Sequence, residues 1–75
     1  MAKLRKAFGS RLRSIREDKR MSQEEFAEFV GISVDFLSLI ERGINAPSFE
    51  TIEKIAERLG VQVAFLFAFE ESEGS

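Results

Sequence analysis

The sequence predicts an all-α fold in which five short helices pack into one compact domain. Apolar residues recur at steps of three and four through most of the chain, the spacing that gives a helix one apolar face. Three serines, Ser22, Ser33 and Ser48, each precede such a segment, and a glycine follows each segment. A chain of 75 residues has room for a single domain with a thin core. We therefore expect one domain over residues 1–69, followed by an acidic flexible tail over residues 70–75.

The first predicted helix covers residues 4–19. Its apolar stripe advances by four, four and three residues and consists of Leu4, Phe8, Leu12 and Ile15. Its other faces carry most of the basic side chains. Residues 1–20 hold eight of the eleven Lys and Arg and only two acids, a charge of +6, whereas the rest of the chain has a charge of −8. Any basic face is therefore built mostly by this helix, although a solvated charge run is the ordinary explanation of such a segment.

A second helix is expected to begin at Gln23. Ser22 and Glu25 have the spacing of a capping box, in which the hydroxyl and the carboxylate each bind a free backbone N–H. Gly31 ends this helix, because a rapid reversal needs a residue in the left-handed conformation, which glycine adopts without a Cβ clash. The residues expected to be buried are Phe26, Ala27 and Val30.

Ser33 caps a third helix over residues 34–42, which has Leu37 and Ile40 on its inner side and ends at Gly43. Ser48 then caps a fourth helix, which keeps the helical period until Gly60 at the apolar positions Phe49, Ile52, Ile55, Ala56 and Leu59. The last apolar segment, VQVAFLFAF, alternates and would also suit a strand. Because it follows a glycine-terminated helix in an otherwise helical chain, we expect a short fifth helix over residues 62–69.

The composition argues against catalysis. The chain contains no Cys and no His, so it lacks thiol nucleophiles, thiolate metal sites, the usual general base and the commonest metal ligand. Glu24, Glu25 and Glu28 resemble a catalytic cluster, but solvated charge is the ordinary explanation of acids at an exposed helix start. No apolar run is long enough to span a bilayer, and no export signal is present. We expect a cytoplasmic protein with no catalytic residue, no metal site and no cofactor.

Residues 23–42 carry a pattern typical of two helices that cross steeply after a tight turn. Apolar residues stand where both helices face the core, a small residue where the backbones approach, and a glycine where the chain turns. Seven positions fit this pattern: Phe26, Ala27, Val30, Gly31, Ile32, Leu37 and Ile40. Their agreement is a strong signal for a helix-turn-helix.

With this pattern the chain resembles the phage-repressor-like (XRE, Cro and repressor type) helix-turn-helix family, whose members have a five-helix, lambda-repressor-like DNA-binding domain. The resemblance covers about residues 9–67 and rests on RLRSIREDKRMSQEEFA, GISVDFLSLIERG and NAPSFETIEKIAERLGV. It implies a helix-turn-helix at about residues 23–42 whose second helix, the recognition helix, lies in the major groove of double-stranded DNA.

The resemblance also implies which residues meet the DNA backbone. Gln23 matches a family Gln that binds a phosphate at the positive end of its helix. Arg16 and Glu41 match a family pair that ties the recognition helix to the first helix, so Arg16 is not counted as a DNA contact. The other candidates for the phosphate-facing set are Arg11, Arg13, Arg42, Asn45 and, at its margin, Phe36.

The implied base-reading positions are Ser33, Val34, Asp35, Ser38 and Leu39. Family members often carry Gln, Arg, Lys or Asn at several of these positions, and this chain departs from that pattern. Val34 and Leu39 can touch thymine methyl groups. Asp35 can accept a hydrogen bond from a cytosine amino group, and Ser38 can bond to several bases or to a phosphate. Because these side chains offer few base-specific contacts, specificity is expected to depend also on DNA shape and on the pairing of two half-sites.

In many family members the last helix forms a two-fold dimer contact. We expect such a contact at Phe65, Leu66 and Phe69, which would set two recognition helices about 34 Å apart, one turn of DNA. The alternative is that this segment only caps the core.

The expected function is that of a homodimeric, nucleoid-associated regulator of transcription, repressor or activator, on a pseudo-palindromic operator. Its partners would be DNA, a second copy and RNA polymerase, with no membrane and no small-molecule ligand. The rival hypothesis is a protein–protein interaction module of the antitoxin or anti-regulator type, with little or no DNA binding. Its binding patch would consist of Phe29, Val34, Phe36 and Leu39.

Overall fold

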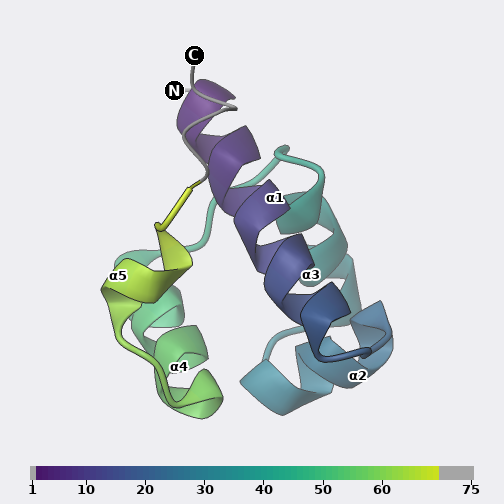
Figure 1. Ribbon diagram of the computed structural model, residues 1–75. Helices are drawn as coiled ribbons and strands as arrows, with labels where there is room; N and C mark the ends of the chain where they lie inside the picture. Colours follow the sequence, from purple (N-terminus) through teal and green to yellow (C-terminus); the bar gives the residue numbers. More distant parts are fainter. Residues whose placement is uncertain (1, 70–75) are drawn as a thin grey trace.

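The computed structural model describes residues 2–69, and every regular element within that range is a helix. The helices follow the chain as α1 (Ala2–Asp18), α2 (Gln23–Val30), α3 (Val34–Glu41), α4 (Phe49–Leu59) and α5 (Val63–Leu66). Figure 1 shows α1 running along the middle of the molecule, with α2 and α3 on one side of it and α4 and α5 on the other. The all-α, five-helix prediction is confirmed. The expected acidic tail, residues 70–75, lies outside the described residues.

The predicted helix boundaries depend on serine caps and left-handed glycines, and both are present. The Ser22 hydroxyl accepts from the backbone N–H of Glu25 at 3.1 Å, and the Glu25 carboxylate accepts from the backbone N–H of Ser22 at 2.8 Å, which completes the capping box. At α3 and α4 the cap is the serine hydroxyl: Ser33 and Ser48 each accept from the backbone N–H of the third residue of the helix, at 3.1 Å. Gly31 ends α2 at φ 84°, where glycine escapes the steric penalty of other residues.

The predicted boundaries of three helices need correction. α1 begins at Ala2 and ends at Asp18, so it is longer at its start than the apolar stripe suggested, and α3 ends at Glu41 because Arg42 is its C-cap. α5 is a single turn, Val63–Leu66, rather than a helix over residues 62–69. Its N-cap residue, Gln62, makes no side-chain capping bond, and one uncapped turn gains little from helix cooperativity.

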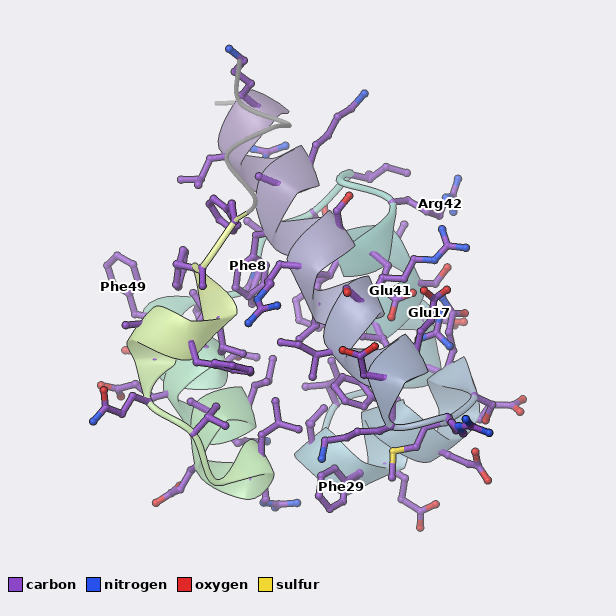
Figure 2. All side chains as sticks on the ribbon, in the orientation of Figure 1. Phe8, Glu17, Phe29, Glu41, Arg42 and Phe49 are labelled. Carbon is purple, nitrogen blue, oxygen red and sulfur yellow. The ribbon has the colours of Figure 1, made fainter. Side chains whose placement is uncertain are left out.

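The hydrophobic core lies between α1 and the other helices. Its buried apolar residues are Phe8, Leu12, Ile15, Phe26, Ala27, Val30, Leu37, Ile40, Ile52, Ile55, Ala56 and Leu66. Three residues assigned to apolar stripes lie outside this buried set: Leu59 is partly buried against it, whereas Leu4 is 55 % exposed and Phe49 is 84 % exposed. Figure 2 shows the Phe49 ring directed away from the helices, whereas Phe8 lies between α1 and the α4–α5 side. The two exposed residues stand in the first turn of a helix, where the apolar period continues beyond the neighbours that could cover it.

The contact between α1 and α3 is unusually close at Gly9. A Cβ atom placed on this glycine would lie 2.2 Å from the backbone oxygen of Ile40 and 3.0 Å from that of Glu41. Only hydrogen can occupy this position, so Gly9 fixes how near the two backbones approach. Gly9 was not among the residues predicted to pack closely, although an isolated glycine inside a helical pattern is a usable signal of close packing.

Candidate nucleic-acid interface

The segment Gln23–Glu41 forms two helices joined by a very short turn. The backbone N–H groups of Gly31 and Ile32 both bond to the carbonyl oxygen of Ala27, at 2.8 and 3.0 Å, and so close the end of α2. The inner residues of α3, Leu37, Ile40 and Glu41, are buried, which leaves the opposite side of the helix to solvent. This is the arrangement that a helix needs if its outer face is to enter a groove.

The five predicted base-reading residues differ in exposure. Ser33 and Asp35 are exposed, whereas Val34, Ser38 and Leu39 are half-buried. The side chains of Val34 and Phe36 pack partly against the core. The continuous apolar patch of the rival hypothesis is therefore smaller than its four residues suggest, because of these only Phe29, at 40 %, is a large exposed apolar side chain.

α3 is tied to α1 by the predicted ion pair. The Arg16 Nε donates to Glu41 Oε2 at 2.7 Å, and Nη2 donates to Oε1 at 3.0 Å, so the pair is bidentate. A third donor, Nη1, bonds to the carbonyl oxygen of Met21 at 3.0 Å. Glu41 is 9 % exposed. The hydrogen bonds with Glu41 raise the pKa of Arg16 above its ordinary value, against the opposing effect of burial.

Gln23, the first residue of α2, belongs to the same network. Its side-chain amide donates to Glu41 Oε1 at 3.0 Å, and the side chain is half-buried. The amide nitrogen carries a second N–H, so this contact leaves a donor for another acceptor. Gln23 was predicted to bind a phosphate, whereas its bond to Glu41 was not predicted; this bond joins the start of α2 to the end of α3 through one carboxylate.

Three of the other predicted phosphate-facing residues are exposed side chains on α1 or near the end of α3. Arg13 is exposed and pairs with Glu17 at 3.1 Å on the surface of α1, while Arg42 and Asn45 are exposed at and just after the end of α3. This loop is held by a contact that was not predicted from the sequence: Arg5 Nη1 donates to the carbonyl oxygen of Ile44 at 3.1 Å.

Arg11 lies elsewhere. Its Nε donates to the carbonyl oxygen of Phe65 at 3.0 Å, and its guanidinium carbon lies 4.4 Å from the centre of the Phe65 ring. The structure therefore places Arg11 against α5, apart from the other candidate cations. The expected dimer contact also needs a correction, because Leu66 is fully buried in the core of one chain. Phe65 is 45 % exposed, and Phe69 is half-buried beside Phe67, with ring centres 6.0 Å apart.

Five short helices, a two-helix segment with a tight turn, and a second helix with a buried inner and open outer side define a helix-turn-helix domain. The comparison with known proteins agrees. The chain belongs to the helix-turn-helix family, whose model matches residues 12–66. None of the helices within residues 2–69 is long and apolar enough to cross a membrane.

Similar proteins include repressors and control proteins. The chain is 34 % identical over 65 residues to the cryptic phage CTXphi transcriptional repressor RstR of Vibrio cholerae, covering 87 % of this chain and 59 % of that protein. It is 42 % identical over 67 residues to the control protein C.BamHI of Bacillus amyloliquefaciens, covering 88 % and 83 %. The crystal structure of the restriction-modification controller protein C.AhdI from Aeromonas hydrophila has a TM-score of 0.80 and 33 % identity, covering 88 % and 96 %.

The overlap with other relatives is partial. The chain spans 39 % of the immunity repressor protein of Bacillus phage phi105, to which it is 38 % identical over 56 residues. Of these three relatives, two are named as repressors and one as a control protein.

Proposed function

We propose that this protein binds DNA sequence-specifically as a homodimer and regulates transcription from a pseudo-palindromic operator. The observation that carries the proposal is the way α3 is held against the rest of the domain. Its inner side is fixed by core packing and by the bidentate contact of Glu41 with Arg16, while Ser33 and Asp35 face solvent. A reading helix must be held rigidly, because a small displacement misaligns its hydrogen bonds with base edges.

The side chains around α3 divide into positioning and reading groups. Arg13, Arg42, Asn45 and Gln23 would bind phosphates, which give affinity without sequence information. Asp35 and Ser38 would accept or donate hydrogen bonds at base edges, and Val34 and Leu39 would contact thymine methyl groups. Arg11 is not among the residues proposed here to bind phosphates, because its guanidinium is held against Phe65.

A second copy of the chain would bind the second half-site of the operator. Phe65 and Phe69 remain the proposed contacts, without the buried Leu66, and the exposed Val63 on the same short helix adds apolar surface. Two-fold pairing would set the recognition helices about 34 Å apart. Occupation of such an operator would block RNA polymerase or recruit it, and the concentration of the protein would set the occupancy.

The direct test is selection of duplexes from a random library by the purified protein at low salt. We expect enrichment of an inverted repeat whose half-site centres are about ten base pairs apart. Asp35→Ala or Leu39→Ala should change the preferred base at one position per half-site, whereas Arg13→Ala should weaken binding to all sequences and reduce its salt dependence. Lys54→Ala, which removes an exposed cation on α4, is the matched control and should do neither.

Two results would contradict the proposal. Absence of any enriched sequence, with retention lost at modest salt, would leave only unspecific attraction and favour the protein-binding alternative. Tighter binding of Asp35→Ala to every sequence would show that this acid only repels the backbone and reads nothing.

A further inference from the structure

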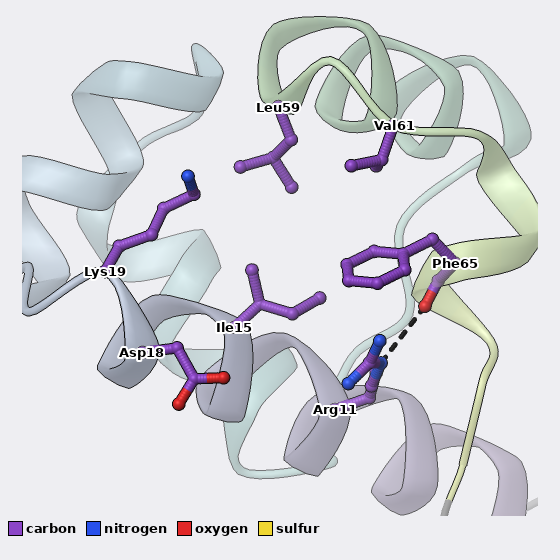
Figure 3. A pocket seen from close by; sticks show the side chains of 7 residues that line it. All are labelled: Arg11, Ile15, Asp18, Lys19, Leu59, Val61 and Phe65. Carbon is purple, nitrogen blue, oxygen red and sulfur yellow. Dashed lines mark hydrogen bonds between the residues drawn. The ribbon is translucent and has the colours of Figure 1, made fainter.

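A groove separate from the helix-turn-helix lies between the second half of α1 and the junction of α4 with α5. It has a volume of about 240 Å³ and is lined by Arg11, Ile15, Asp18, Lys19, Leu59, Val61 and Phe65. None of these residues belongs to α2 or α3. Figure 3 shows the aliphatic side chains of Ile15, Leu59 and Val61 converging on the middle of the groove, with polar side chains around them. The groove therefore combines an apolar floor with a charged edge.

Arg11 is held in a fixed orientation at one end of this groove. Its Nε bonds to the carbonyl oxygen of Phe65 at 3.0 Å, and its guanidinium stacks on the Phe65 ring at 4.4 Å. These two contacts remove much of the rotational freedom that an exposed arginine keeps. The two terminal nitrogens make no hydrogen bond to any residue in the range 2–69. They offer a preformed fork of donors of the kind that binds a carboxylate.

The charge around the groove favours an anion. Lys19 extends along the opposite end toward Leu59, and its Nζ lies 5.9 Å from the centre of the Phe29 ring. Asp18 is the opposing group, but Figure 3 shows its carboxylate directed away from the other lining side chains. Neither Lys19 nor Asp18 takes part in an ion pair within the described part of the chain. Two cations and one acid therefore line the groove, and the carboxylate of the acid points away from its middle.

We propose that this groove binds a small organic anion: a carboxylate attached to a short branched-aliphatic or aromatic body. The carboxylate would accept two hydrogen bonds from the terminal nitrogens of Arg11, with Lys19 adding attraction. The apolar body would cover Ile15, Leu59 and Val61, which removes their side chains from water. The groove is smaller than the roughly 300–1,000 Å³ that holds drug-sized ligands, so the ligand is a molecule of benzoate size. This proposal does not depend on DNA binding by α3, although the groove shares Phe65 with the proposed dimer contact.

The test is an NMR titration of the full chain with methyl groups labelled, which places reporters inside the groove at Ile15, Leu59 and Val61 and a reference in the core at Leu37. The probes are sodium benzoate and sodium 4-methylpentanoate, compared with sodium acetate, which has almost no apolar body, and benzyl alcohol, which has no charge. We expect saturable shifts at the three groove residues, and dissociation constants at least about ten-fold lower for the two test anions than for the two comparison compounds. The Leu37 methyl signals should not move.

Three variants separate the groups that the proposal uses. Arg11→Gln keeps a donor near the Phe65 carbonyl but removes the charged fork, and it should raise the dissociation constant for benzoate about ten-fold or more. Asp18→Asn should lower that constant, because it removes the opposing charge. Lys3→Gln, an exposed cation at the far end of the same helix, should leave it unchanged. Unshifted Leu37 signals in each variant would show that the fold is intact.

The proposal is overturned if benzoate gives no saturable shift at the groove, or if acetate binds equally well, since the apolar floor would then play no part. It is also overturned if Lys3→Gln weakens binding as much as Arg11→Gln, which would indicate unspecific attraction to a basic helix. A third contrary result is a groove whose signals respond to protein concentration but not to either test anion. That outcome would assign the surface to a second copy of the chain.

Discussion

Removal of Glu41 tests whether α3 is held by its buried ion pair. The carboxylate accepts three hydrogen bonds, two from Arg16 and one from Gln23, and its side chain is only 3 % exposed. Glu41→Ala leaves the Arg16 guanidinium, itself 13 % exposed, with one remaining bond to the Met21 carbonyl. Breaking one side of a buried pair costs about 3–5 kcal/mol, and a chain of this size has a free energy of unfolding of about 4–11 kcal/mol. The variant should therefore lose a large part of its stability.

Urea unfolding followed by circular dichroism measures this loss. With a slope of about 1 kcal/mol per molar urea, the midpoint should fall by about 3–5 M. The matched control is Glu17→Ala, which breaks the pair of Glu17 with Arg13, whose side chains are 56 % and 60 % exposed. That pair should contribute less than about 1 kcal/mol. Equal costs for Glu41→Ala and Glu17→Ala would refute the reasoning, because burial would then make no difference.

The double variant Arg16→Met, Glu41→Leu adds a second check. It leaves no unpaired buried charge, so it should be more stable than Glu41→Leu alone.

The contribution of Arg16 to the free energy of unfolding depends on pH with a definite sign. Because the folded-state pKa of Arg16 is raised, its contribution is fully present below the ordinary arginine pKa and is lost only in strongly alkaline solution. Titration of Arg16 should therefore leave stability unchanged at neutral pH.

Three further predictions concern local structure and are measured by the same urea unfolding. Gly9→Ala, which elsewhere in a helix would stabilise, should cost about 1–3 kcal/mol or more because the new Cβ meets the Ile40 backbone oxygen; a gain in stability would contradict the close approach. Ser22→Ala should cost about 1 kcal/mol through loss of the capping box, and no loss would show that the cap is replaced by water. Phe49→Ser should change stability by less than about 0.5 kcal/mol, whereas Phe8→Ala should cost about 3–5 kcal/mol; similar costs would contradict the assigned burial.

Local signals in the sequence predicted local structure well. The starts of α2, α3 and α4 depend on serine side chains that bond within three residues, and the end of α2 depends on the conformation of Gly31. Such features involve only neighbouring residues, so the sequence contains all the information they need. The helix-turn-helix itself was predictable for the same reason, since its apolar positions and its turn fall within twenty residues.

Features that depend on distant neighbours were predicted less well. The apolar period placed Phe49 on an inner face, but whether a face is covered depends on where the other helices end. The length of α5 depends on packing, because its segment suits a strand and a helix alike. Arg11 is a cation like Arg13 in the sequence, and only the position of Phe65 across the fold distinguishes their surroundings.

α3 carries its anchoring residues and its outward residues at separate positions. Leu37, Ile40 and Glu41 are buried and hold the helix, while Asp35 is exposed and makes no hydrogen bond to another residue among those described. Ser33 and Val34 are the exceptions, since the Ser33 hydroxyl also caps the helix and the Val34 side chain packs partly against the core. Asp35, Ser38 and Leu39 can therefore be randomised together in a library with little loss of folded protein. One scaffold can then present many different surfaces, and selection for a new target need not begin with repair of the fold.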